Sequence, residues 1–340
     1  MWWDEERGSV CLINQTVLPG RQEIITCTTL ERLIRAIANL EVRGAPALGV
    51  AGAYGMALAA LRSEERDLNA FKEEMQKAAA ALKDTRPTAV NLSWGVDQVL
   101  SVMQEARSVE EARDRALKRA DVVAEEDERI CRLLGKYGAD LLPDGCTVLT
   151  HCNAGGLACR AWGTALGVIK TAVQSGKEIH VIACETRPLF QGARLTAWEL
   201  ARSGIDVTVI VDSAAAFLMR KGSVDLVLVG ADRITRDAVF NKIGTYMHAV
   251  SAHHHHLPFY VAAPISTFDF RHTEKDIRIE ERSREEIACT GGVRIVPEQV
   301  RVLNYAFDAT PMELVTAIVT EQGLLRPPFD IEKVHTEKHL

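Results

Sequence analysis

The sequence predicts an α/β protein in which a smaller N-terminal helical domain, carrying a β-hairpin, precedes a C-terminal domain with a Rossmann-like, mostly parallel sheet. Two observations support this class. Apolar residues recur at helical spacing up to about residue 137, and after Pro143 short β-branched runs alternate with helical patterns. Such alternation requires crossover connections, which give a parallel sheet covered by helices on both faces. We expect the two domains to span residues 1–138 and 139–340.

In the N-terminal domain, the first expected element is the hairpin. Residues 12–20 form its first strand and a Pro-Gly turn, and residues 23–27 form its second strand. A further helix is expected after the junction that ends at Thr88. Helical periodicity predicts helices at 30–40, 48–61, 68–82 and 109–134.

The C-terminal domain contains a series of expected strands, each a short apolar run bounded by loop residues. The chain then reads Asp308-Ala-Thr-Pro, a helix-start pattern, so we expect a final helix that extends to about Gln322. The expected strands are residues 146–150, 179–184, 207–211, 226–229, 259–262 and 302–307.

Composition excludes several classes of protein. The net charge is −6 and the 40 lysines and arginines are scattered, which argues against nucleic acid as the main partner. No run reaches the roughly 18 apolar residues of a membrane-spanning helix. No signal-peptide pattern is present, so we expect a cytoplasmic protein. The eight cysteines contain no CxxC pair, which predicts free thiols in a chain of this length.

Two strands deliver a reactive side chain into a loop. Cys152 follows the strand at 146–150 and precedes a glycine-rich turn, and Asp232 follows the apolar run 225–229. Ligands of open α/β folds bind beyond the carboxyl ends of the strands, so both side chains are placed at the expected reaction site. Taken alone, Cys152 could be a packed structural cysteine, and Asp232 could be a helix cap or the ion-pair partner of Arg233. Together they favour proton-transfer chemistry.

Neighbouring residues add further expectations. A helical pattern at 157–169 follows the glycine turn, so Cys152 is expected near a helix N-terminus, where backbone amides favour a thiolate. His151 is interpreted as an orienting or packing residue. The run His253–His256 lies at the end of a helical stretch, and consecutive helical residues cannot all bind one ion. We therefore expect a solvated helix end and no metal site.

Four loop-to-helix junctions carry polar side chains suited to a phosphorylated ligand. Guanidinium groups and helix amides act together on phosphate, and amide side chains bind hydroxyl groups. A single junction of this kind is common in loops and carries little information, but four such junctions in one chain indicate a small anionic substrate. The junctions are Arg43-Gly44-Ala45-Pro46, Thr85-Arg86-Pro87-Thr88, Glu185-Thr-Arg187-Pro with Gln191, and Asn241-Lys242 at the start of an expected helix.

Eight motifs follow one another along the chain: Arg43-Gly-Ala-Pro-Ala, Arg86-Pro-Thr-Ala-Val-Asn-Leu, Thr150-His-Cys-Asn-Ala-Gly, Glu185-Thr-Arg-Pro, Gln191-Gly-Ala-Arg-Leu-Thr-Ala, Gly230-Ala-Asp-Arg-Ile, Asn241-Lys-Ile-Gly-Thr and Pro258-Phe-Tyr-Val-Ala-Ala-Pro. In this order they resemble the S-methyl-5-thioribose-1-phosphate isomerase family over nearly the whole chain. The wider superfamily includes ribose-1,5-bisphosphate isomerases, 5-deoxyribose-1-phosphate isomerases and the regulatory subunits of translation initiation factor 2B.

The resemblance implies an aldose–ketose isomerase of methionine salvage, which converts 5-methylthioribose 1-phosphate to 5-methylthioribulose 1-phosphate. It implies that Cys152 and Asp232 are the catalytic pair. It also implies a homodimer without a metal or organic cofactor. The substrate-binding residues that it implies are Arg43, Gly44, Ala45, Arg86, Gln191, Asn241 and Lys242.

The implied chemistry suits these residues. With phosphate on C1 the sugar has no free aldehyde, so the ring must open before hydrogen moves from C2. Asp232 could protonate the ring oxygen or handle the O2 proton. Cys152 could remove the C2 proton or support a direct hydride shift in a dry pocket. Both routes remain open at this point.

One departure from the family pattern lies between Asp232 and Asn241. Many family members carry an Asn-Gly-Asp turn and one more residue in this stretch, whereas this chain has Arg-Ile-Thr-Arg-Asp-Ala-Val-Phe. The difference leaves the substituent at the sugar 5-position open, so 5-deoxyribose 1-phosphate and ribose 1,5-bisphosphate are rival substrates. A regulatory subunit would need the phosphate-binding residues but not the acid–base pair. A dinucleotide-dependent oxidoreductase is disfavoured, because no GxGxxG follows the first strand of the C-terminal domain.

Overall fold

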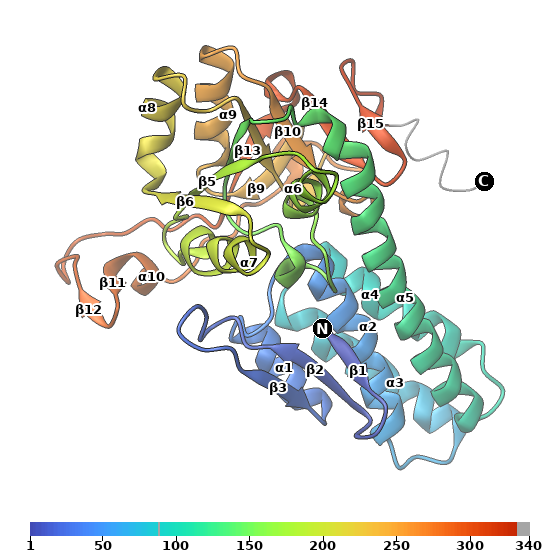
Figure 1. Cartoon of the computed structure of the whole chain (residues 1–340). Coiled ribbons are helices and arrows are strands. Elements are labelled where there is room, and N and C mark those ends of the chain that lie inside the picture. The colour runs from blue at the N-terminus through green and yellow to red at the C-terminus, as the bar shows by residue number, and fades with distance from the viewer. Residues whose placement is uncertain (88, 332–340) are drawn as a thin grey trace. The chain divides into compact units, whose positions relative to one another are not determined.

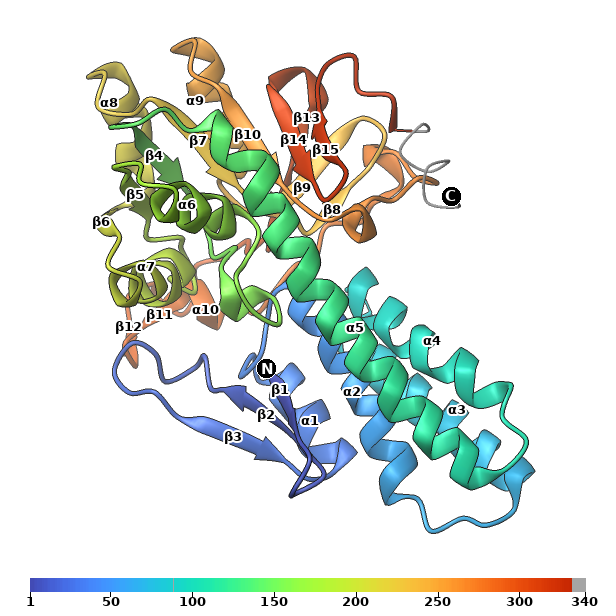
Figure 2. The ribbon, with the colours of Figure 1, turned by 45° about the vertical axis from the view of Figure 1, so that its right-hand side comes forward.

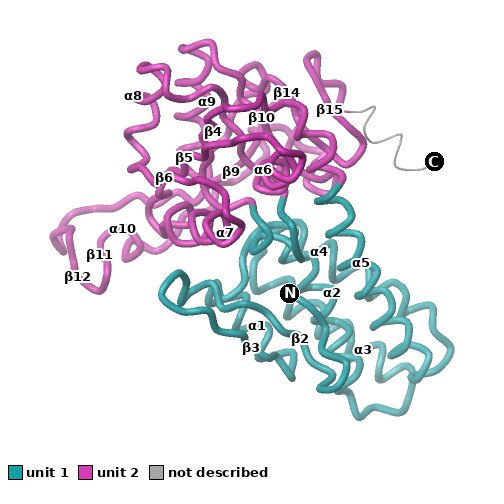
Figure 3. Tube along the Cα trace, in the orientation of Figure 1, with its two compact units in different colours: residues 1–132, 155–163 teal, residues 133–154, 164–340 magenta. Residues whose placement is uncertain are grey.

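A computed structural model describes residues 1–87 and 89–331 of the chain. The chain forms two compact units, which Figure 3 shows in different colours. Unit 1 contains Met1–Arg132 and Gly155–Gly163, and unit 2 contains Leu133–Ala154 and the described chain from Thr164 onward. The segment Gly155–Gly163 therefore belongs to unit 1 although the chain on either side of it belongs to unit 2.

Unit 1 combines a small antiparallel sheet with a group of helices. Strands β1 (Trp2–Asp4), β2 (Ser9–Ile13) and β3 (Ile24–Cys27) form the sheet in that order. Strands β2 and β3 are the expected hairpin, and β1 adds a further antiparallel strand beside β2. The helices are α1 (Leu30–Ala38), α2 (Ala45–Arg62), α3 (Leu68–Thr85), α4 (Val90–Gln104) and the part of α5 (Val109–Gly138) that precedes Leu133.

Helix α2 forms the centre of unit 1. Nearly every residue from Ala47 to Ala60 is buried, as expected for a helix that other elements surround on all sides. Glycines let α4 approach it closely, because a Cβ atom on Gly95 would lie 1.9 Å from the carbonyl oxygen of Gly49. Figure 2 shows the unit 1 part of α5 beside α2 and α4, and its buried alanines join the same apolar core.

Unit 2 is built on one large sheet. Its strands are β4 (Thr147–Thr150), β5 (His180–Cys184), β6 (Asp206–Ile210), β7 (Leu226–Val229), β10 (Phe259–Ala262), β14 (Ala317–Thr320) and β15 (Gly323–Leu325). They lie in the order β15-β14-β10-β7-β4-β5-β6, with the outer strands labelled in Figure 1 and the central strands β4 and β7 labelled in Figure 2, and only the β14–β15 pair is antiparallel. The predicted Rossmann-like, mostly parallel sheet is confirmed.

The helices of unit 2 are short and flank this sheet. Helices α8 and α9 contribute buried residues to one apolar core with the inward-facing side chains of β4, β7 and β10. The helices are α6 (Ala165–Gln174), α7 (Ala197–Arg202), α8 (Ala215–Arg220), α9 (Thr245–His254) and α10 (Glu285–Ala288). Among the described residues, no helix is both long and apolar enough to cross a membrane.

Two smaller sheets complete unit 2. Strands β8 (Arg233–Ile234), β9 (Ala238–Lys242) and β13 (Phe307–Pro311) form an antiparallel sheet with β9 in the middle. Strands β11 (Cys289–Thr290) and β12 (Val293–Arg294) form a separate pair. Asn241 and Lys242 thus end a buried strand, and the prediction that they begin a helix is wrong, because α9 starts only at Thr245.

Two expectations about the last third of the chain are also wrong. The predicted strand at 302–307 is not formed, and β13 begins only at Phe307. Leu303 is 68% exposed, so this apolar run is not the buried strand that the pattern indicates. The expected helix from Asp308 to Gln322 is replaced by β13, a 3-10 turn and β14. The β-branched residues of β14 are fully buried between β10 and β15, and this packing overrides the local helix signal.

The helix expected after Cys152 begins later than the sequence pattern indicates. Of the predicted stretch 157–169, only the part from Ala165 belongs to α6. A 3-10 turn at Gly156–Ala158 and a bend occupy the preceding residues, which are part of unit 1. Cys152 therefore precedes a loop rather than the first turn of an α-helix.

Candidate active site

The site of unit 2 lies where the strand order reverses. From β4 the chain continues to β5 and β6 on one side, and from β7 it continues to β10 and β14 on the other. Strands β4 and β7 are parallel neighbours, so their carboxyl ends lie at the same edge of the sheet, which is the usual ligand position of such sheets. Cys152 follows β4 and Asp232 follows β7. The sheet thus brings the two predicted catalytic residues to its switch point.

The backbone of Cys152 is held in the left-handed region, with φ at +63°. Its amide donates a hydrogen bond to the Thr186 hydroxyl at 2.9 Å, and its carbonyl accepts one from the Thr196 hydroxyl at 2.6 Å. Both threonines are fully buried. The peptide units on both sides of Cys152 are thus held by the loop after β5 and by the π-helical turn Gly192–Thr196, which fixes the direction of its Cα–Cβ bond.

The loop that follows β5 has the same unusual conformation. Thr186 and Phe190 also have positive φ, 66° and 57°, and non-glycine residues rarely adopt this conformation without external support. Both oxygens of Asp212 supply that support, since they accept hydrogen bonds from the amides of Thr186 and Arg187 at 2.7 and 2.8 Å. Gly192 is required nearby, because a Cβ atom there would lie 1.7 Å from the Cys184 carbonyl oxygen.

Asp232 is joined through its backbone to the strand that carries Asn241 and Lys242. Its amide donates a hydrogen bond to the Phe240 carbonyl at 2.9 Å, which continues the β8–β9 hairpin. The hairpin closes tightly at residues 235–238, with the Thr235 amide bonded to the Ala238 carbonyl. The altered stretch between Asp232 and Asn241 is therefore an ordered hairpin that places Asp232 beside Asn241.

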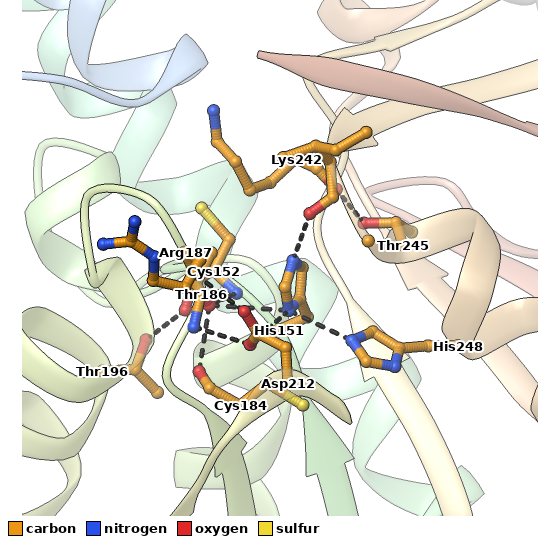
Figure 4. A network of polar contacts seen from close by, with 12 residues as sticks. His151, Cys152, Cys184, Thr186, Arg187, Thr196, Asp212, Lys242, Thr245 and His248 are labelled. Carbon is orange, nitrogen blue, oxygen red and sulfur yellow. Dashed lines mark hydrogen bonds and ion pairs between the residues drawn. The ribbon is translucent and has the colours of Figure 1, made fainter. Parts of the chain in front are cut away.

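Asn241 and Lys242 are buried, with 5% and 8% of their surfaces exposed. The Asn241 amide donates to the Thr245 hydroxyl at 3.1 Å, and the Lys242 amine donates to the Ala306 carbonyl at 2.8 Å. The Lys242 amine also lies 4.6 Å from the centre of the Phe307 ring. Figure 4 shows that the Lys242 amine and the Cys152 thiol both extend away from His248.

The turn after Lys242 is held from β13. Gly244 has φ at +101° and precedes α9. The Asp308 carboxylate accepts hydrogen bonds from the amides of Gly244 at 2.7 Å and Tyr246 at 3.2 Å, and so satisfies donors at the start of the helix. Burial raises the pKa of Asp308 to about 6, although these hydrogen bonds and Lys242 oppose the shift.

Two buried histidines lie behind Cys152. The His151 Nε2 atom is 2.8 Å from the Ile243 carbonyl oxygen, and its Nδ1 atom is 3.2 Å from Nε2 of His248, which lies on α9. Burial lowers the pKa of His151 to about 4 and that of His248 to about 3, so both rings are neutral near pH 7. The prediction that His151 is an orienting or packing residue agrees with this position.

Two groups of donor atoms among the described residues are close enough to be considered as metal ligands. Atoms of His151, Cys184 and His248 lie within 4.8 Å of one another, as do those of Asp127, Cys131 and Cys159 in unit 1. In the first group, the facing nitrogens of the two rings share a hydrogen bond. The His253–His256 run forms no part of either group, and His253, His254 and His256 are exposed at the end of α9.

Gln191 begins a π-helical turn, Gly192–Thr196, that leads into α7. Its side chain is 5% exposed, and its amide oxygen is buried without a hydrogen-bond partner. Buried polar atoms in native proteins are nearly always paired, so an unpaired acceptor here suits a hydroxyl group supplied by a ligand. π-helical turns are themselves frequent at functional sites.

The remaining predicted site residues lie in unit 1. Arg43, Gly44 and Ala45 form the start of α2, where Gly44 is the N-cap with φ at +104°. A Cβ atom on Gly44 would lie 2.5 Å from the Cα atom of Ala158, so only glycine permits this contact with the segment Gly155–Gly163. Arg86 is half-buried at the C-terminal cap of α3, ahead of α4.

Several residues that shape the site were not singled out as site residues by the sequence. Thr196 and His248 lie inside helical patterns, where nothing in the local sequence distinguishes them from packing residues. Asp212 and Thr186 each lie just beyond the carboxyl end of a strand, the same signal that identified Cys152. Asp308 belongs to an Asp-Ala-Thr-Pro motif that predicts a helix start, so the sequence did not indicate that it lies on a strand next to Gly244. The eight cysteines are free thiols, as predicted.

Comparison with known proteins identifies the group to which this arrangement belongs. Residues 41–327 match the initiation factor 2 subunit family. The chain belongs to that family. A methylthioribose-1-phosphate isomerase from Heliobacterium modesticaldum is 50% identical over 333 residues, which cover 97% of this chain and 96% of the relative.

Solved structures agree with this assignment. A 5-methylthioribose 1-phosphate isomerase from Pyrococcus horikoshii is 42% identical with a TM-score of 0.90, and the match covers 96% of this chain and 92% of that one. A protein described as translation initiation factor eIF-2B, subunit delta, from A. fulgidus is 56% identical with a TM-score of 0.88, covering 97% and 96% of the two chains. Within the family, the chain groups with the methylthioribose-1-phosphate isomerases.

The raised pKa of Asp308 predicts how stability depends on pH. The folded pKa of about 6 exceeds the unfolded value of about 4, so the folded state binds this proton more tightly. The Asp308 contribution to the unfolding free energy should therefore fall as pH rises from about 4 to about 6. In the Asp308→Asn variant this decline should be absent.

Urea unfolding of parent and variant across that pH window provides the measurement. His151 and His248 contribute with the opposite sign, because their pKa values are lowered, but they are present in both proteins and cancel in the difference. The unfolding free energy of the variant minus that of the parent should rise with pH. A difference that is constant with pH would contradict the assignment.

Proposed function

We propose that this chain is an aldose–ketose isomerase that converts 5-methylthioribose 1-phosphate to 5-methylthioribulose 1-phosphate in methionine salvage. The observation that carries this proposal is the pair of adjacent parallel strands β4 and β7, which are followed by a thiol and a carboxylate at the same edge of the sheet. Family membership and a relative of that name, 50% identical over nearly its full length, support the same reaction.

Cys152 and Asp232 are the proposed acid–base pair. Asp232 donates a proton to the ring oxygen as the sugar opens, which leaves an electron-poor C1. Cys152 is the base that removes the C2 proton and returns it to C1, while Asp232 takes the proton from O2 as the ketone forms. The hydrogen moves within the substrate and both residues return to their starting states, so no external oxidant or reductant is consumed.

The substrate-binding roles that the family resemblance implies are part of this proposal. In unit 2, the unpaired amide oxygen of Gln191 suits a sugar hydroxyl, and Lys242 supplies a buried positive charge next to Asn241. In unit 1, Arg43 directly precedes the N-terminus of α2, a place where a guanidinium group and helix amides act together on phosphate, and Arg86, at the C-terminal cap of α3, is proposed to act through its guanidinium group alone. The ordered β8–β9 hairpin positions Asn241, so the altered loop is compatible with these roles.

Substitution of the catalytic pair tests the reaction. Cys152→Ser and Asp232→Asn should each lower turnover of 5-methylthioribose 1-phosphate by about 100-fold or more, the usual contribution of a positioned acid or base. The thermal unfolding midpoint should stay near that of the parent protein. Cys289→Ser is the matched control, because this cysteine lies on the separate β11–β12 pair and should leave turnover unchanged.

The same assay separates the rival functions. Preferred turnover of 5-deoxyribose 1-phosphate or ribose 1,5-bisphosphate would reassign the substrate while keeping the catalytic pair. A parent protein that binds these sugar phosphates without converting any of them would contradict the isomerase and favour a regulatory subunit. Loss of folding in both variants would return Cys152 and Asp232 to a structural role.

Isotope exchange tests the route of hydrogen transfer. If Cys152 carries the proton from C2 to C1, the reaction in deuterium oxide should place solvent deuterium at C1 of the product, because a thiol proton exchanges with water. Nuclear magnetic resonance of the product measures this directly. Complete retention of the C2 hydrogen at C1 would instead support a direct hydride shift.

We also propose that the protein is a cytoplasmic homodimer. Helices α8 and α9 carry exposed apolar side chains, among them Phe217 at 59%, Tyr246 at 45% and Val250 at 43% exposed. Exposed apolar residues gathered on neighbouring elements are typical of protein–protein interfaces. A second copy of the chain is the partner that the family resemblance implies.

Light scattering with size-exclusion chromatography tests this assembly. The parent protein should have twice the mass of one chain, and Phe217→Glu should shift it toward the monomer by burying a charge in the interface. Val122→Glu, at an exposed position of α5 in unit 1, is the matched control and should leave the mass unchanged. A monomeric parent protein would contradict the proposal.

A further inference from the structure

His151 and His248 form a buried pair whose proton positions are fixed by their neighbours. The two ring centroids are 4.7 Å apart, and the rings meet edge to face at 64°. The Ile243 carbonyl can only accept, so His151 donates to it from Nε2, and its Nδ1 atom is then an acceptor. His248 must therefore donate from its Nε2 atom to His151.

The pair is not explained by stability. Both residues are almost completely buried, with His151 1% and His248 0% exposed. The Nδ1 atom of His248 has no hydrogen-bond partner, and a buried acceptor without a partner is a cost to the folded state. The nearest charged groups are Asp212, 3.9 Å from the Nδ1 atom of His151, and Lys242, which lowers the pKa of His151. Asp212 is already committed to two backbone amides.

His151 links the end of β4, which carries Cys152, to the turn that follows Asn241 and Lys242. On one side His151 directly precedes Cys152, whose backbone is held in the left-handed region. On the other side the ring bonds the turn that follows Asn241 and Lys242. It also packs against that turn, since a Cβ atom on Gly244 would lie 3.2 Å from the Cε1 and Nε2 atoms of the ring. Figure 4 shows this ring between the Lys242 backbone and His248.

We propose that His151 and His248 are positioning residues for the isomerisation, and that their hydrogen bond sets the place of the Asn241–Lys242 strand end relative to Cys152. His248, on α9, orients the His151 ring by donating a hydrogen bond to its Nδ1 atom. The oriented ring then holds the Ile243 carbonyl through the hydrogen bond from its Nε2 atom. The pair touches no reacting atom in this scheme. The proposal rests on the catalytic role of Cys152 proposed above.

Substitution of His248 tests the proposal without touching the residues of the reaction. His248→Leu removes the donor to His151 and should lower kcat by about 100-fold, the loss expected when reacting groups are misplaced by about 1 Å. KM should rise as well, because Asn241 and Lys242, the proposed binding residues, lie on the strand end that the bond positions. His248→Gln keeps an N–H donor and should recover most of the lost kcat. His254→Leu, on the exposed end of α9, is the matched control and should leave kcat unchanged.

Two further measurements distinguish positioning from simple packing. A packing role would lower the thermal unfolding midpoint together with kcat and would not be restored by glutamine, whereas we expect midpoints of the leucine and glutamine variants close to the parent value. Nitrogen chemical shifts of the parent protein should show both rings neutral and protonated on Nε2 near pH 7. A parental kcat in His248→Leu, or a His151 ring protonated on Nδ1, would overturn the proposal.

The outcomes also separate this proposal from the one on which it rests. If Cys152→Ser is inactive while His248→Leu retains parental kcat, only the positioning role fails. If Cys152→Ser retains parental turnover, the proposed catalytic role fails, whatever the effect of His248→Leu.

Discussion

The left-handed backbone at Cys152 is the constraint on which the site depends. A non-glycine residue in this conformation costs of order 1 kcal/mol or more, so it persists only where the surroundings impose it. Here the surroundings are the hydroxyl groups of Thr186 and Thr196, which hold the amide and carbonyl of Cys152. Thr186 itself has positive φ and is held by Asp212. The strain at the end of β4 is thus supported in turn from the ends of β5 and β6.

This arrangement connects the sheet to the smaller β8–β9–β13 sheet at two points. The Asp232 amide bonds Phe240, which links the end of β7 to β9, and the His151 ring bonds the Ile243 carbonyl, which links the end of β4 to the turn after β9. Cys152, Asp232, Asn241 and Lys242 are consequently carried at or just beyond strand ends rather than on long loops. Rigid elements hold catalytic groups more precisely than loops do.

The sequence predicts the parts of this architecture that local signals control. Strands such as β7 and β10 are short apolar runs between loop residues, and the polar residues that follow them are placed by the topology of a parallel sheet. β14 could not be predicted in this way, because its strand state comes from burial between β10 and β15. Nor could His248, since only the folded chain brings it to His151, 97 residues away. The sequence shows that the loop at Thr235 differs from the family pattern. That this loop closes as a hairpin is seen only from the pairing of β8 with β9.

The cap that Asp308 provides has a consequence for how the protein is made. The amides that it binds belong to Gly244 and Tyr246, more than 60 residues earlier in the chain. During synthesis the strand β9 and helix α9 emerge well before β13, so the turn after Lys242 lacks its cap, and β9 lacks one of its two neighbours, until β13 has left the ribosome. A chain that stopped near residue 300 would contain Cys152 and Asp232, yet the turn beside them would still be unsupported. Assembly of the site is therefore coupled to the synthesis of β13, more than 60 residues further along the chain.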